Sequence, residues 1–134
     1  MQLKHFFIAG LLSVISFASC SKKNNDIIKA DVPIEGTWAG KHSYLSDPLN
    51  NHYSFKIKAG GILERLDANG QKIGEGTWAF YNANTAITGS YTLTGGATFS
   101  IIANFDKVTG KLDGTWGNGT NDYNGGYWFM NKVQ

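Results

Sequence analysis

His42 and His52 are the residues whose types and spacing most suggest chemistry. They fall on the first expected strand and near the start of the second, so a hairpin would bring them near each other. A zinc or copper site needs a third ligand, and Asp47 is the only carboxylate in the connection between them. Because this ligand set is sparse, we predict two independent histidines at the rim of a barrel and no metal site.

Glu64 is the carboxylate of most interest for ligand recognition. In one register it shares the inward face of its strand with Leu66, where it would bind a hydroxyl or an amine of a ligand. In the other register Leu63 and Arg65 face inward instead. The strand mixes polar and apolar residues, so the sequence leaves both registers open.

No nucleophile, base and orienting group form a catalytic pattern in this chain. The acidic residues of the C-terminal half occupy expected turns and strand ends, where backbone hydrogen bonding accounts for them: Asp106, Asp113 and Asp122. We therefore predict that the protein is not an enzyme and that it uses no cofactor.

Cys20 is the only cysteine, so neither an intrachain disulfide nor a cysteine zinc site can form. It follows a basic start and a short apolar run over residues 6–17, which are typical of a signal peptide. Phe17-Ala18-Ser19-Cys20 resembles the bacterial lipobox, in which a cysteine receives a diacylglycerol before cleavage. The resemblance implies a signal peptide over residues 1–19, a lipidated Cys20 and a membrane as partner. The alternative is an ordinary secretory signal with an incidental cysteine.

The residues after Cys20 indicate where the chain is expected to go. In lipoproteins, a serine such as Ser21 in place of aspartate implies sorting to the outer membrane. Residues 21–25 lack the acidic side chains of surface-displayed lipoproteins, so we expect the periplasmic face of the cell envelope. Residues 20–34 are polar, lack periodicity and include Pro33, which indicates a lipidated tether. The formal net charge is +2 and the basic residues are dispersed, so nucleic acid is not an expected partner.

Residues 35–134 are expected to form one all-β domain. Apolar and polar residues alternate with period two, and turn-forming clusters recur at short intervals. Asn69-Gly70 predicts a tight hairpin with positive φ at both residues. The expected strands cover residues 35–45, 53–58, 62–68, 72–81, 87–93, 99–105, 112–116 and a last segment ending near residue 133. About eight strands with short connections predict an antiparallel up-and-down barrel, and a two-sheet sandwich is the alternative.

The sequence Gly-Thr-Trp occurs three times, at residues 36–38, 76–78 and 114–116. We expect each glycine to leave space for a neighbouring indole, each threonine to face outward and each tryptophan to fill the barrel. The Gly-x-Trp at the start of the first strand resembles the signature of the lipocalins and calycins over residues 35–134. The resemblance implies a cup-shaped barrel that binds a small apolar molecule. Unlike secreted lipocalins, this chain lacks their C-terminal helix, their disulfides and a clear basic residue to pack over Trp38.

Inward-facing aromatic side chains and one histidine make up the expected ligand-binding set: Trp38, His42, Tyr44, Phe55, Trp78, Phe80, Tyr91, Phe99 and Trp116. The same side chains would also fill a barrel that has no cavity, and the sequence leaves both interiors open. A hollow barrel would bind a small apolar or aromatic molecule in the envelope, with residues 46–51 as a mobile lid. A filled barrel would be a protein-interaction module, such as a periplasmic inhibitor or an outer-membrane accessory lipoprotein, using the loop 117–126 with its Tyr123 and the adjoining Tyr127.

Overall fold

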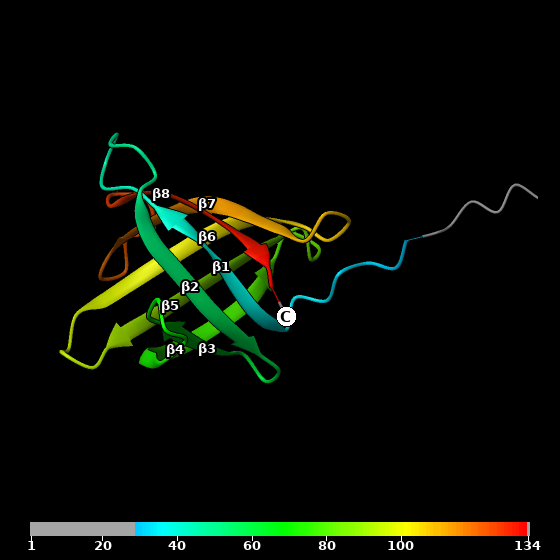
Figure 1. Cartoon of the computed structure of the whole chain (residues 1–134), viewed down its shortest axis with the longest axis horizontal. Coiled ribbons are helices and arrows are strands. Elements are labelled where there is room, and N and C mark those ends of the chain that lie inside the picture. The colour runs from blue at the N-terminus through cyan, green and yellow to red at the C-terminus, as the bar shows by residue number, and fades with distance from the viewer. Residues whose placement is uncertain (1–28, 134) are drawn as a thin grey trace, which may run out of the picture.

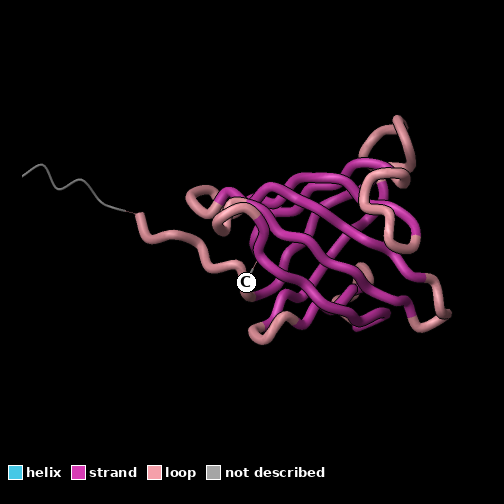
Figure 2. Tube along the Cα trace, turned by 180° about the vertical axis from the view of Figure 1, so that it is seen from behind, coloured by secondary structure: helices cyan, strands magenta, loops and turns pink. Residues whose placement is uncertain are grey.

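The computed structural model describes residues 29–133, and the expected signal peptide and Cys20 lie outside this range (Figure 1). The described residues form eight strands: β1 (Gly36–His42), β2 (Asn51–Lys58), β3 (Ile62–Leu66), β4 (Lys72–Tyr81), β5 (Ala86–Leu93), β6 (Thr98–Asp106), β7 (Lys111–Asn118) and β8 (Gly126–Lys132). Figure 2 shows strands and loops as the only elements of this part of the chain, and no helix in it is suited to span a membrane.

Each strand pairs antiparallel with the next one, and β1 also pairs with β8, so that the sheet closes on itself. At the seam Trp38 lies opposite Lys132 of β8 and opposite Phe55 of β2. Because closure pairs every strand on both sides, the sheet has no free edge. The predicted all-β, eight-stranded up-and-down barrel is confirmed.

The two ends of the barrel differ. We call the end where β1 starts the closed end; its connections are residues 59–61, 82–85 and 107–110. The other end, with connections 43–50, 67–71, 94–97 and 119–125, is the open end, and its loops lie on the left in Figure 1. Fully buried apolar side chains fill the half of the interior toward the closed end: Trp38, Ile57, Leu63, Ile87, Ile101, Leu112 and Met130. The half of the interior toward the closed end is therefore packed with apolar side chains.

Residues 31–34 lie against the closed end and seal it. The Val32 amide donates to the Lys107 carbonyl (2.7 Å), and the Ile34 carbonyl accepts a hydrogen bond from Trp38 Nε1 (2.7 Å). Ile34 is buried with the barrel core. These contacts fix the last residues of the expected tether to the base of the barrel, where the chain enters from the right in Figure 1.

Lys132 packs over Trp38, with its Nζ 5.2 Å from the ring centroid. The same Nζ donates to the carbonyls of Pro33 (2.7 Å) and Glu35. The expectation that no basic residue covers this tryptophan was therefore wrong. The sequence does not predict this contact, because Lys132 is far from Trp38 in the chain and comes beside it only where β1 pairs with β8.

The glycines of two Gly-Thr-Trp copies serve a different purpose from the one expected. A Cβ on Gly76 would lie 1.8 Å from the Ser90 carbonyl oxygen, and one on Gly114 would lie 1.9 Å from that of Ile102. The space is thus taken by the backbone of a neighbouring strand and not by an indole. These glycines let adjacent strands approach each other closely.

The turn at Asn69-Gly70 is wider than a two-residue hairpin. Gly70 has φ of +79°, but Asn69 is not among the residues with positive φ. Asp67 organises the five-residue connection, because its carboxylate accepts hydrogen bonds from the amides of Asn69 (2.8 Å) and Gln71 (2.9 Å). An Asx turn of this kind replaces the expected left-handed pair.

Candidate functional site

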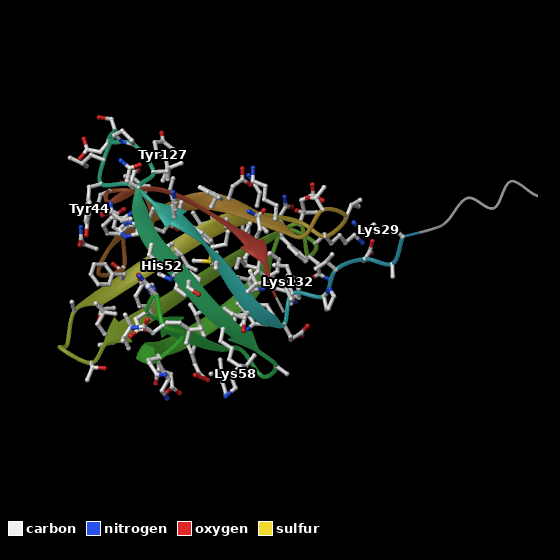
Figure 3. The ribbon with its side chains drawn as sticks, in the orientation of Figure 1. Lys29, Tyr44, His52, Lys58, Tyr127 and Lys132 are labelled. Carbon is white, nitrogen blue, oxygen red and sulfur yellow. The ribbon has the colours of Figure 1, made fainter. Side chains whose placement is uncertain are left out.

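A cavity of about 430 Å³ occupies the open half of the barrel. Residues from seven strands and two loops line it: His42, Tyr44, Leu45, Tyr53, Arg65, Ile73, Tyr91, Leu93, Phe99, Trp116, Asn118, Asn124 and Gly125. Its volume lies in the range of pockets that hold small organic molecules. Figure 3 labels Tyr44 at this end of the barrel, and Lys132 nearer the entry of the tether. The interior is therefore filled toward the closed end and hollow toward the open end.

Trp116 forms one wall of the cavity. Its ring lies 5.8 Å from Phe99, 5.6 Å from Tyr44 and 5.5 Å from His42, measured between centroids. Its Nε1 donates to the Ser43 carbonyl (2.8 Å), which fixes the indole in one orientation. An aromatic ring that is already fixed in orientation offers a flat apolar surface to a ligand and loses little conformational entropy when the ligand binds.

Hydrogen bonds at the rim of the cavity join residues 43–45, which follow β1, to residues 125–127 at the start of β8. Leu45 N donates to Gly125 O (2.6 Å), and the buried Ser43 hydroxyl accepts from Tyr127 N (3.0 Å). Tyr44 and Leu45 thereby sit at fixed places on the rim. Residues 46–51, the expected lid, do not line the cavity, and their movement stays a prediction.

Two tyrosine hydroxyls meet deep in the cavity. Tyr53 Oη and Tyr91 Oη are 2.9 Å apart and buried. Below them lie the rings of Phe55, 4.8 Å from Tyr53, and Trp128, 5.6 Å from Tyr53. Burial raises the pKa of both tyrosines, and the proximity of Tyr91 raises that of Tyr53 further. Both hydroxyls are therefore protonated at neutral pH.

Arg65 extends into the same region. Leu63 is fully buried and Arg65 lines the cavity, whereas Glu64 points outward and pairs with Lys58 (2.9 Å). The structure thus has the register with Leu63 and Arg65 inside. The Arg65 guanidinium stands 4.7 Å from the Tyr53 ring centroid and donates to the carbonyls of Ser54 (3.2 Å), Leu66 and, through Nη2, His52 (3.2 Å).

His42 faces the cavity, 4.8 Å from the Tyr53 ring. Burial lowers the pKa of His42, and the charge of Arg65 lowers it further, against a hydrogen bond with Ser43 that raises it. The imidazole is therefore neutral at neutral pH. His52 is exposed on the outer face, and residues 29–133 contain no group of three or more side chains suited to hold a metal ion.

Five of the nine side chains expected to bind a ligand line the cavity: His42, Tyr44, Tyr91, Phe99 and Trp116. Trp38 and Phe55 belong to the buried core. Trp78 and Phe80 lie toward the closed end, where Trp78 Nε1 donates to the Lys58 carbonyl (2.8 Å) and Phe80 packs 6.3 Å from Phe105. Ligand contact by any of the nine stays a prediction.

The expected set left out Tyr53 and Arg65, which are two of the polar residues that line the cavity. Tyr53 shares the inward face of a clearly alternating strand with Phe55, so its position was readable from the pattern. Arg65 was inward in one of the two registers considered. Asn118, the last residue of β7, and Asn124 both fell in the expected loop 117–126, and a loop gives no side-chain period to read.

Comparisons with known proteins identify no relative. No protein-family model, no curated protein and no solved structure matches the chain.

Proposed function

We propose that the barrel binds one small molecule with an apolar or aromatic body in the cavity at its open end. The observation that carries this proposal is the cavity itself: about 430 Å³ of space above a filled core, walled by Trp116, Phe99 and Tyr44. A barrel of eight strands encloses either packed side chains or one small ligand. Here the packed side chains end at the level of Phe55, and the space above them supports the second role.

The experiment is a titration with N-phenyl-1-naphthylamine, a neutral apolar dye whose fluorescence rises in apolar surroundings. We expect saturable dye binding with one site per chain. Native mass spectrometry after incubation with envelope lipid extracts and hydrophobic metabolites should detect a bound small molecule. Leu93→Trp places an indole in the cavity and should abolish dye binding, because Leu93 lines the space. Val108→Trp adds the same ring at an exposed turn of the closed end and should leave binding intact. Equal binding by both variants, or none by the wild type, would contradict the proposal.

A second candidate function is docking of a protein partner on the outside of the open end. Tyr123 and Tyr127 are 71% and 61% exposed, and with Leu45 they line a groove of about 470 Å³. Exposed tyrosines beside an aliphatic side chain are typical of interaction surfaces. Tyr123→Ser with Tyr127→Ser should remove a partner captured from an envelope extract, while dye binding in the cavity persists.

The proposed site of action is the cell envelope, with the protein anchored through a lipidated Cys20 on the periplasmic face of the outer membrane. The support is the signal-peptide pattern and the lipobox resemblance. Incorporation of labelled palmitate into the wild type, and its loss in Cys20→Ala, is the expected result. Labelling of both proteins, or of neither, would contradict lipidation at this residue.

A further inference from the structure

Arg65 brings an uncompensated positive charge to the cavity. None of the four ion pairs found among residues 29–133 includes it. The cavity lining contains no aspartate or glutamate, and His42 is the only other ionisable base in it. The hydrogen bonds that Arg65 makes go to backbone carbonyls, which orient the guanidinium without neutralising its charge.

The guanidinium also keeps donor capacity. Arginine has five N–H donors, and three of its hydrogen bonds in this structure go to Ser54, Leu66 and His52. The remaining donors stand beside the Tyr53 ring at the cavity wall. A positioned guanidinium with free donors is a strong partner for a negatively charged oxygen.

The tyrosine pair adds a further donor. Two hydroxyls bring two protons, and the bond between Tyr53 and Tyr91 uses one of them. The second proton finds no side-chain acceptor among the residues described, and the neighbouring Arg65 side chain has donors only. The deep part of the cavity therefore presents donors from two residue types and lacks an acidic acceptor to satisfy them.

We propose that the ligand is an amphipathic organic anion whose acidic group binds Arg65 and the Tyr53–Tyr91 pair while its apolar body lies against Trp116 and Phe99. This inference rests on the proposed function of the cavity and specifies its ligand class. A carboxylate or sulfonate supplies the oxygen acceptors that the three polar side chains lack. The apolar walls explain why a simple inorganic anion would not fill the site.

The test compares two dyes of the same ring system. 8-Anilinonaphthalene-1-sulfonate has the rings of N-phenyl-1-naphthylamine and an added sulfonate, which is ionised at any working pH. We expect the sulfonate dye to bind the wild type at least ten-fold more tightly than the neutral dye. Arg65→Gln should remove this preference, so that the affinity for the sulfonate dye falls about ten-fold more than the affinity for the neutral dye. Arg65→Lys should retain part of the preference, because it keeps the charge and loses the planar fork.

Lys56→Gln is the matched control, since it removes the same charge from an exposed position on the outer face of β2. It should leave both affinities unchanged. Circular dichroism and the urea midpoint verify that each variant is folded. Equal affinity of the wild type for the two dyes, or an equal loss of both in Arg65→Gln, would overturn the anion inference and leave the cavity function standing. Failure of both dyes to bind the wild type would overturn the cavity function itself.

Discussion

The Tyr53 and Tyr91 hydroxyls lie 2.9 Å apart although their strands, β2 and β5, do not pair. The bond therefore crosses part of the barrel interior and links two non-adjacent strands deep in the cavity. The ring of Phe55, 5.4 Å from that of Tyr91, completes the layer. This layer separates the packed core from the hollow half.

The first prediction concerns this hydroxyl pair. Tyr91→Phe leaves the Tyr53 hydroxyl buried without its partner and should lower the free energy of unfolding by about 1–3 kcal/mol. The double variant Tyr53→Phe with Tyr91→Phe removes both polar groups and should cost less than the sum of the single variants. Urea unfolding of the four proteins completes the cycle. If the losses of unfolding free energy in the two single variants added up to that of the double variant, the two hydroxyls would not stabilise each other.

The second prediction concerns acid stability. Burial lowers the pKa of His42 in the folded protein, whereas the unfolded chain has the ordinary value of about 6.5. Between these two values the unfolded chain binds a proton that the folded protein does not, so stability falls as the pH drops below about 7. His42→Gln should show a smaller loss of melting temperature between about pH 7 and pH 5.

His52→Gln is the control for that measurement, because it removes an imidazole from the outer face of the neighbouring strand. It should follow the wild-type profile. If the melting temperature of His42→Gln depended on pH as strongly as that of the wild type, another group would be the cause of the loss of stability in acid.

The third prediction concerns close strand approach. Gly76→Ala would place a methyl group 1.8 Å from the Ser90 carbonyl oxygen and should destabilise the barrel by about 2–3 kcal/mol. Gly95→Ala is the matched change, because no atom lies within 4 Å of the added group and its φ is not positive. It should be neutral or stabilise by up to about 1 kcal/mol. Similar unfolding midpoints for the two variants would contradict the packing argument.

The fourth prediction concerns the seal of the closed end. Lys132→Met removes the bonds to the carbonyls of Pro33 and Glu35 and the cation–π contact with Trp38, at a cost of about 1–2 kcal/mol. Hydrogen exchange of the Val32 amide should also become faster, because residues 31–34, which include Val32, are then held less firmly against the barrel. Lys111→Met, from an exposed position of β7, should change neither quantity.

The fold was predictable because its signal is local. Side chains alternate between the two faces of every strand, so a residue such as Phe55 reveals its direction without knowledge of its neighbours. Closure also followed from the even strand number and the short connections. Where polarity along a strand is mixed, as around Arg65, this signal fails. Register was then decided by burial of Leu63 and by the outward pair of Glu64 with Lys58.

The site was only partly predictable, because it depends on which level of the barrel each inward side chain occupies. Trp38 and Trp116 share the same tripeptide, the same inward face and the same buried cluster, but only Trp116 also lines the cavity. The difference comes from the stagger of strands around the ring, which sets the height of each residue. The Tyr53–Tyr91 bond likewise joins strands distant in sequence, and no short pattern encodes it.

The attachment of residues 31–34 to the base of the barrel determines how a lipid-anchored molecule would stand. If Cys20 holds the acyl chains that the lipobox resemblance implies, the anchored chain would join the barrel at its sealed base, and the rim with Tyr44 and Leu45 would be the end opposite that attachment.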